Sequence, residues 1–271
     1  TEMKKMEERI RERKNKIQLL HEVAVKMGST KNEEGICRLV VAAAEEILNF
    51  AVCAVDLVEE QRLSSKAVSS SATPAGEDVK RDREIADMTL RTGKTYLISD
   101  LESFKGHDYG NNLAYRSLIS IPIKDAGVFQ AVSEQVGAFS KQDVEMAELL
   151  IAHATEALKR IRSEKKIRYI SFHDSLTGLY NRAFFDEELK RLDTQRQHPL
   201  SIILGDVDGL KLVNDAFGHM EGDRLLGRIT GIIRRACRRE DIICRWGGDE
   251  FAILLPKTDR ETCKKVCNRI E

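Results

Sequence analysis

The sequence lacks any long hydrophobic run, and its positive and negative charges cancel. A membrane-spanning helix needs about 20 consecutive apolar residues, so we expect no membrane segment and a soluble, cytoplasmic protein. The 44 Lys and Arg residues are matched by 44 Asp and Glu residues, which leaves a formal net charge of zero. Because a nucleic-acid-binding protein usually carries a basic field, no nucleic-acid partner is expected.

Proline and cysteine are also scarce. Four prolines in 271 residues, together with 32% charged residues, favour a fold with much helix. The six cysteines have no spacing typical of a disulfide framework. Cys263 and Cys267 lie four residues apart on an expected helix, and we favour packing on a helix face over a shared metal. The length is sufficient for two domains of ordinary size.

Two segments carry apolar residues at alternating steps of three and four. In residues 1–30 the seam is Met3, Met6, Ile10, Arg13, Ile17, Leu20, Ala24 and Met27, in which Arg13 is the one charged member. In residues 140–172 they are Val144, Ala147, Ile151, Ala154, Leu158 and Ile161, after a capping pair formed by Ser140 and Asp143. This spacing favours helices that pair with other helices, and packing of each helix on its own domain is the alternative.

Between these helices, residues 31–139 alternate between helix and strand patterns. Helices are expected over residues 33–48 and 82–94, the second closing at Gly93, and strands over residues 50–58, 96–100, 116–123 and 127–134. This part of the chain has no catalytic constellation, so a ligand-binding or interaction module is expected. The order of the runs SLISIPI, GVFQAVSE and FSKQDVEMAELLIAHATEAL resembles a GAF sensor domain. Nothing in the residues identifies its ligand.

The C-terminal part places acids where strands are expected to end. The run LSIILGDVD, residues 200–208, is predicted to be a buried strand that ends near Asp206. A short helix and turn then precede an amphipathic helix over residues 224–237. In the hairpin RWGGDEFAILL, residues 245–255, Gly247 and Gly248 are expected to supply the positive φ angles of a two-residue turn.

Three carboxylates can meet at this hairpin. If the two strands are neighbours, Asp206 would lie beside Asp249 and Glu250, and their mutual repulsion would call for a cation. Oxygen ligands without Cys or His favour Mg²⁺, with Mn²⁺ as the alternative ion. Acids are also common in turns that bind no metal, and the residues alone leave both interpretations open.

Four motifs in order add a resemblance. DSLTGLYNR, DVDGLKLVNDAFGHMEGD, RRED and RWGGDEF, within residues 173–271, are together similar to the GGDEF domain of diguanylate cyclases. The resemblance implies an α+β fold, with a ferredoxin-like nucleotidyl cyclase palm joined by a long coiled-coil-type helix to the GAF-like sensor. The chain ends at Glu271 inside an expected helix, so the domain is expected to be incomplete and truncated at its C-terminus. The expected division is a signalling helix (1–30), a sensor (31–139), a linker helix (140–172) and a catalytic domain (173–271).

The resemblance also implies roles for individual residues. Mg²⁺ would be held by Asp206, the backbone carbonyl of Val207, Asp249 and Glu250, and the last two would act in catalysis. Guanine would be read by Asn214 and Asp223, phosphate would be contacted by Lys211, and Gly247 and Gly248 would let the backbone lie close to the nucleotide. Arg238 and Asp241 match an R-x-x-D site for inhibitory product.

The implied activity is the condensation of two GTP to cyclic di-GMP plus two pyrophosphates. Each half-site would hold one GTP, so a homodimer is expected, and the paired helices would set whether two catalytic domains meet. Two alternatives stay open: a catalytically silent receptor for cyclic di-GMP or GTP, and a signalling scaffold with a passive palm. Intact Asp206, Asp249 and Glu250 favour the enzyme. The pair at Arg238 and Asp241 has its own alternative, a surface charge pair.

Overall fold

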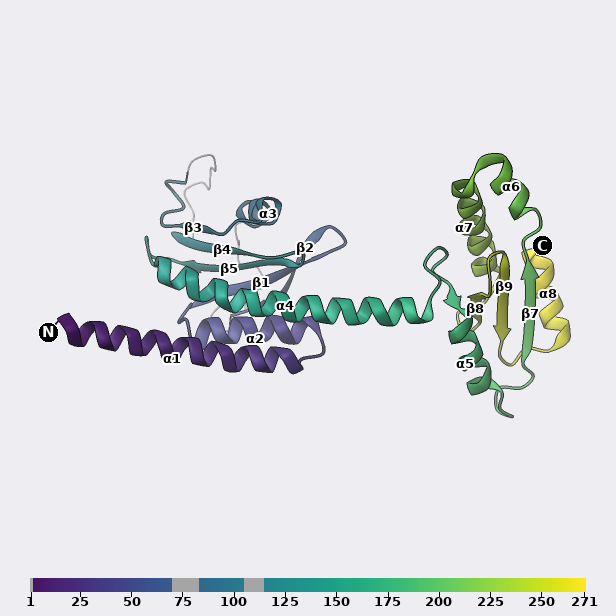
Figure 1. Ribbon diagram of the computed structural model, residues 1–271, viewed down its shortest axis with the longest axis horizontal. Helices are drawn as coiled ribbons and strands as arrows, with labels where there is room; N and C mark the ends of the chain where they lie inside the picture. Colours follow the sequence, from purple (N-terminus) through teal and green to yellow (C-terminus); the bar gives the residue numbers. More distant parts are fainter. Residues whose placement is uncertain (1, 70–82, 105–114) are drawn as a thin grey trace. The chain divides into compact units, whose positions relative to one another are not determined.

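The computed structural model describes residues 2–69, 83–104 and 115–271. The chain divides into two compact units, residues 1–163 and residues 164–271. Helix α4 (Lys141–Phe172) contributes residues to both units (Figure 1). In the described ranges no helix is long and apolar enough to span a membrane.

The first unit is built on a five-stranded sheet in which all neighbouring strands are antiparallel, in the order β2-β1-β5-β4-β3. The strands are β1 (Val52–Glu59), β2 (Arg62–Val68), β3 (Tyr96–Ile98), β4 (Ser117–Ile123) and β5 (Gly127–Ser133). The helices are α1 (Glu2–Ser29), α2 (Glu33–Glu46), α3 (Arg83–Thr92) and the first part of α4.

Both faces of this sheet are covered because its central strands are apolar on both sides. Ile119 of β4 joins the large core formed with α1, α2 and α4. Its neighbour Leu118 points the other way and packs with Ile85 of α3. On that same side, Thr89 of α3 and Ser120 of β4 share a buried hydrogen bond of 2.7 Å. Figure 1 shows α3 on one face and the other three helices on the opposite face.

Most expected elements of this unit are confirmed. α3 ends as predicted at Gly93, whose φ is +63° and whose N–H donates to the Thr89 carbonyl at 2.9 Å. Strand β2 was not expected from its sequence, RLSSKAV. Within the described residues it is an edge strand whose one neighbour is β1, so most of its side chains stay partly exposed and polar residues are tolerated.

The heptad positions of the two long helices divide between core and surface. In α1, Leu20 and Met27 are buried in the domain core, whereas Met3, Met6 and Ile10 are each more than 60% exposed. Packing on its own domain therefore accounts for the second half of α1. In α4, the predicted capping pair is confirmed, and the positions from Val144 to Ile161 pack in the same core. The next apolar residues of α4, Ile167 and Ile170, are exposed.

The second unit contains a four-stranded sheet in the order β6-β8-β9-β7. The strands are β6 (Tyr180–Asn181), β7 (Ser201–Asp206), β8 (Ile242–Arg245) and β9 (Glu250–Leu255). The helices after α4 are α5 (Arg182–Leu192), α6 (Leu210–Phe217), α7 (His219–Ala236) and α8 (Arg260–Ile270). The β8–β9 pair is antiparallel, as the expected hairpin requires, the β9–β7 pair is also antiparallel, and the short β6 adds a parallel pair with β8.

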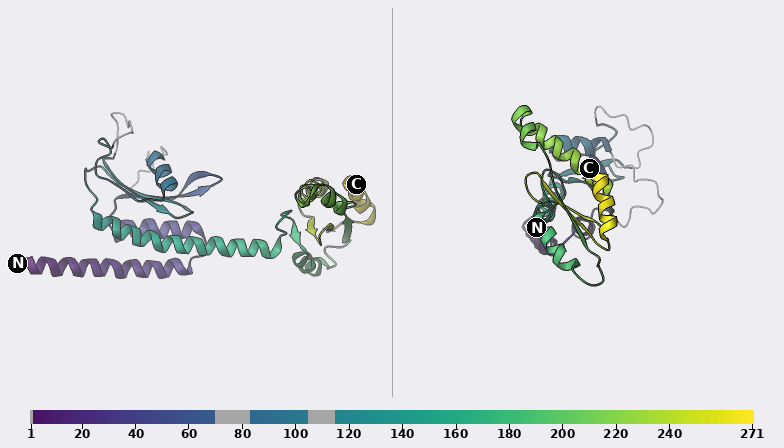
Figure 2. Two further views of the ribbon diagram at one scale, coloured as in Figure 1. Left: turned by 45° about the horizontal axis from the view of Figure 1, so that its top comes forward. Right: turned by 90° about the vertical axis from the view of Figure 1, so that its right-hand side faces the viewer.

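Alternation along β9 separates two cores in this unit. Phe251 and Ile253 pack with Leu226 of α7, while Ala252 and Leu254 pack with Phe185 of α5. Helices therefore cover both faces of the sheet, as the left view of Figure 2 shows for α7 and α5. The six cysteines are all free, and Cys263 and Cys267 on α8 are half-buried, as packing residues would be.

Two expectations about this unit are wrong. Strand β7 is not buried: Ile202 is 45% exposed and Leu204 is 71% exposed. The physical reason is that β7 lies at the edge of the described sheet, where one of its faces is left without a covering helix. Helix α7 begins at His219 and not near Arg224, so Asp223 lies within the helix and not in the turn before it.

Candidate active site

The predicted neighbourhood of the acidic residues is confirmed at the backbone. Strands β7 and β9 pair in a register that places Asp206 directly opposite Glu250. The Val207 N–H then donates to the Asp249 carbonyl at 3.1 Å, which continues the pairing one step beyond the strands. Directly opposed residues in an antiparallel pair lie about 5 Å apart at Cβ, so these acids share one end of the sheet.

The hairpin loop differs from the expected two-residue turn. Residues 246–249 connect β8 to β9, and the Trp246 and Gly247 N–H groups donate to the Glu250 carbonyl at 2.8 and 3.3 Å. Neither Gly247 nor Gly248 has a positive φ, because a four-residue loop reverses the chain without one. A Cβ at Gly247 would lie 2.8 Å from Oε2 of Glu250, so a side chain there would have to displace that exposed carboxylate.

The carboxylates themselves are accessible. Asp206 and Glu250 are exposed and Asp249 is half-buried. Across the residues that the structure describes, no three His, Cys, Asp or Glu side chains are clustered closely enough to hold a metal ion. The three acids are thus adjacent along the backbone without converging at their oxygens. As a donor set they supply oxygen ligands only, which suits Mg²⁺ and not a soft metal.

The helices beside the acids carry the predicted nucleotide-reading residues. Asn214 lies on α6 and packs against α7 at Gly222, where an added Cβ would be 2.0 Å from Asn214 Oδ1. That oxygen is buried and has no hydrogen-bond partner among the described residues. A buried acceptor without a partner costs about 1–3 kcal/mol, so it marks a place where a donor is expected. Asp223, the residue after Gly222, is exposed.

Lys211 is also on α6 and is exposed. Its side chain forms no hydrogen bond or ion pair with any residue in the described ranges. The structure therefore leaves the ammonium group available to a ligand without showing which one.

A cavity of about 630 Å³ lies beside Arg238 and Asp241. The Arg238 N–H donates to an Asp241 carboxylate oxygen at 2.6 Å, so the acid caps its own turn. No ion pair between the Arg238 guanidinium and the Asp241 carboxylate forms in the described part of the chain. Burial raises the pKa of the Asp241 carboxyl above its ordinary value, and the hydrogen bond from Arg238 offsets this only in part.

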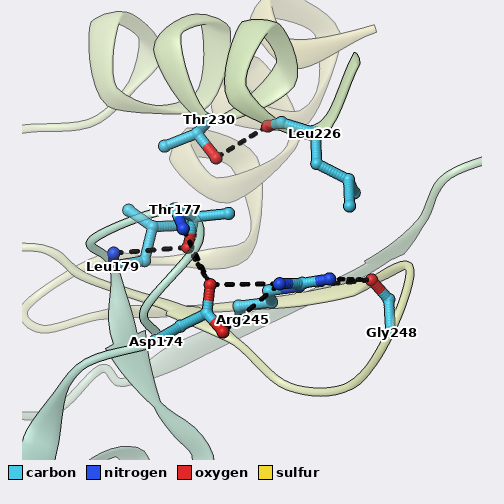
Figure 3. Close-up of polar contacts among 7 residues, drawn as sticks. All are labelled: Asp174, Thr177, Leu179, Leu226, Thr230, Arg245 and Gly248. Carbon is cyan, nitrogen blue, oxygen red and sulfur yellow. Dashed lines mark hydrogen bonds and ion pairs between the residues drawn. The ribbon is translucent and has the colours of Figure 1, made fainter. Parts of the chain in front are cut away.

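A polar network behind the loop was missed by sequence reasoning. It joins Asp174 and Thr177, in the turn after α4, to Arg245 and the Gly248 carbonyl (Figure 3). The available signal was the spacing Asp-x-x-Thr, which is typical of a side-chain-capped turn. No sequence pattern indicates that Arg245 of β8 would contact that turn.

Two family models match the chain. Residues 171–271 match the model described as "Diguanylate cyclase, GGDEF domain", and residues 30–159 match the model of the GAF domain. The chain thus has a segment similar to GAF domains, followed by a segment similar to GGDEF domains. The GGDEF match includes the acidic hairpin, the α6–α7 pair and the R-x-x-D turn.

Known relatives of the GGDEF part include diguanylate cyclases. Uncharacterized protein YtrP of Bacillus subtilis is 30% identical over 170 residues, which are 61% of this chain and 29% of that protein. Diguanylate cyclase DgcP of Pseudomonas aeruginosa is 41% identical over 101 residues, 36% of this chain and 15% of the relative. The chain therefore spans less than a third of these relatives.

Among solved structures, the coiled coil and GGDEF domain of DgcB from Caulobacter crescentus in complex with c-di-GMP matches with 28% identity and a TM-score of 0.40. The match covers 45% of this chain and 66% of that one.

Proposed function

We propose that the chain is a diguanylate cyclase, which condenses two GTP to cyclic di-GMP and releases two pyrophosphates. The observation that carries the proposal is the register that places Asp206 opposite Glu250 and joins Val207 to Asp249, within a segment that matches the GGDEF family. Relatives named as diguanylate cyclases support the same reaction class.

The three acids are proposed to hold Mg²⁺ together with the backbone carbonyl of Val207, with Mn²⁺ as the alternative ion. Bound there, the ion would neutralise charge on the nucleotide phosphates. The exposed side chains of Asp206 and Glu250 are free to rotate toward Asp249, and these acids would orient the nucleotide within reach of its partner. Gly247 and Gly248 would let the loop backbone approach the phosphates, and Lys211 would add a positive charge.

Guanine recognition is proposed for α6 and α7. The unpartnered Oδ1 of Asn214 is an acceptor that suits an N–H group of the base. The neighbouring Asp223 carboxylate would accept from the N1–H and 2-amino groups, which distinguish guanine from adenine. This arrangement leaves an adenine base without matching donors.

Control of the reaction is proposed at two places. Cyclic di-GMP would bind at Arg238 and Asp241 in the adjoining cavity and inhibit synthesis, because an arginine fork suits phosphates and guanine edges. The GAF domain, whose ligand is unknown, would control whether two catalytic domains meet in a homodimer. The proposed division is a signalling helix (1–30), a sensor (31–139), a linker helix (140–172) and a catalytic domain (173–271).

The decisive experiment incubates the protein with GTP and Mg²⁺ and identifies the products by mass. We expect cyclic di-GMP from the parent and a loss on the order of 100-fold or more for Glu250→Gln. Arg238→Ala is the matched second variant: it should keep synthesis and lose inhibition by added cyclic di-GMP.

Each outcome separates the enzyme from the alternatives. Synthesis that persists in Glu250→Gln would contradict the role of the hairpin acids. No product from the parent, combined with cyclic di-GMP binding that Arg238→Ala removes, would establish a receptor instead. If the parent neither makes nor binds cyclic di-GMP, the signalling scaffold is the alternative that remains.

A further inference from the structure

One guanidinium joins the loop that carries Asp249 to the turn that follows α4 (Figure 3). Nε and Nη2 of Arg245 donate to the Gly248 carbonyl at 3.2 and 2.7 Å. Nη1 of the same side chain donates to both carboxylate oxygens of Asp174, at 3.1 and 3.2 Å. Because the guanidinium is planar and rigid, these four contacts fix the loop carbonyl relative to the carboxylate.

Asp174 is itself held in place by its own turn. Its Oδ1 accepts from the Thr177 N–H at 2.8 Å and from the Thr177 hydroxyl at 2.7 Å. Its backbone closes the turn, donating to the Leu179 carbonyl at 2.8 Å and accepting from the Gly178 N–H at 2.9 Å. Arg234 of α7 donates to the Gly178 carbonyl at 2.9 Å, which ties this turn to the helix layer. The anchor for Arg245 is therefore rigid.

The pair is shielded from solvent more than other ion pairs of this unit. The side chains of Arg245 and Asp174 are 15% and 22% exposed, whereas Arg191 and Arg224 are more than 60% exposed in their pairs. A half-buried pair is screened less by water and salt, and removal of one partner leaves a partly buried charge. Burial alone raises the pKa of the Asp174 carboxyl, but hydrogen bonds from Thr177 and Arg245 outweigh it and hold the pKa below its ordinary value.

We propose that Arg245 and Asp174 are positioning residues for the acids of the hairpin. Asp174 orients the Arg245 guanidinium, and the guanidinium holds the loop through the Gly248 carbonyl, so that Asp249 and Glu250 stay beside Asp206. This inference rests on the proposed cyclase function. Misplacement of reacting groups by about 1 Å costs on the order of 100-fold in rate, so a looser loop should lower kcat more than it changes KM for GTP.

The chain contains a reporter for this loop that needs no activity. Trp246, the single tryptophan, follows Arg245 directly. Its ring lies 4.5 Å below the Arg182 Cζ atom and 5.3 Å from the Phe185 ring, edge to face. Iodide quenching of its fluorescence therefore measures how tightly the loop is held.

The experiment compares three variants of the whole chain. Asp174→Asn removes the charge, and Arg245→Lys keeps a charge but cannot contact Asp174 and Gly248 together as a fork. Asp100→Asn is the matched control, because Asp100 forms a similar half-buried pair with Arg116 in the first unit. Each variant is measured for Trp246 quenching, kcat and KM for GTP, and midpoint of thermal unfolding.

We expect Asp174→Asn and Arg245→Lys to increase iodide quenching and to lower kcat by about tenfold or more, with KM changed by less than about threefold. Asp100→Asn should change neither. Unchanged quenching in both variants would overturn the proposal, because the pair would then not hold the loop. Parental quenching and kcat in Arg245→Lys would also overturn it, because a positive charge without the fork would then suffice. If the parent makes no cyclic di-GMP, the proposed cyclase function is rejected. The quenching result then still decides whether the Asp174–Arg245 pair holds the loop.

Discussion

At the scale of single residues, Asn214 and Gly222 show how closely the site is packed. The two residues belong to different helices, and only the absence of a side chain at Gly222 leaves room for the Asn214 amide. Gly227, five residues further along α7, has open space where a Cβ would be added. Packing therefore excludes a side chain at Gly222 but would admit one at Gly227.

Gly222→Ala should displace Asn214 and weaken GTP binding. Overpacking of this kind costs about 1–3 kcal/mol, which exceeds the roughly 0.5–1 kcal/mol that alanine gains over glycine within a helix. Gly227→Ala, the control, should gain the stability that alanine gives a helix and should bind GTP as the parent does. Isothermal titration with GTP and a thermal melt test both. Equal GTP affinity in the two variants would contradict the placement of Asn214 in the site.

Protonation of Asp174 at low pH should release the hairpin loop. Its pKa in the folded protein is lowered, so the ion pair with Arg245 contributes stability above the ordinary aspartate pKa of about 4 and loses it as the pH falls through the folded value. Trp246 fluorescence, titrated from pH 7 downward, should change only below about pH 4. Asp174→Asn should remove that transition, and at neutral pH the Trp246 fluorescence of this variant should already be that of a loosened loop. A transition that survives in Asp174→Asn would assign it to another acid.

At the scale of elements, α1 combines two different surfaces in one continuous helix. Its second half contributes Leu20 and Met27 to the sensor core, and its first half leaves a row of apolar side chains exposed. Periodicity alone cannot separate these halves, because the same spacing serves a coiled-coil seam and a helix packed on a sheet.

Leu20→Ala and Ile10→Ala should therefore differ in stability by several kcal/mol. Leu20 is fully buried, and its truncation should cost about 2–5 kcal/mol. Ile10 is 62% exposed, and its truncation should stay within about 0.5 kcal/mol in a dilute sample. Urea unfolding followed by circular dichroism measures both. A large, concentration-dependent loss for Ile10→Ala would show instead that the first half of α1 pairs with another chain.

At the scale of the whole molecule, two units have separate hydrophobic cores. Phe129 lies in the core of the first unit and Phe185 in a core of the second, and each is almost fully buried. Separate cores predict separate cooperative transitions.

Scanning calorimetry should resolve two transitions, and each variant should move only one. Phe129→Ala and Phe185→Ala should each destabilise its own unit by about 3–5 kcal/mol. Phe185→Ala should move the transition that also changes Trp246 fluorescence, because Trp246 packs on Phe185. A single transition shifted equally by both variants would mean that the units unfold as one.

Elements whose patterns are local could be predicted from the amino-acid sequence alone. Hydrophobic period predicted the long helices and the strands that enter and leave the hairpin, and four motifs in order indicated the GGDEF family. The capping pair Ser140 and Asp143 and the end of α3 at Gly93 followed from chemistry within a few residues.

Features that depend on residues far apart in the sequence became visible only in the folded chain. Exposure of Leu204 follows from the edge position of β7, and the strand RLSSKAV forms because β1 lies beside it. The contact from Arg245 to Asp174 spans 71 residues, and the overlap of Asn214 with Gly222 depends on how two helices pack. Hydrophobic period encodes which face of an element is buried, but it does not encode which element covers that face or which polar groups meet across it.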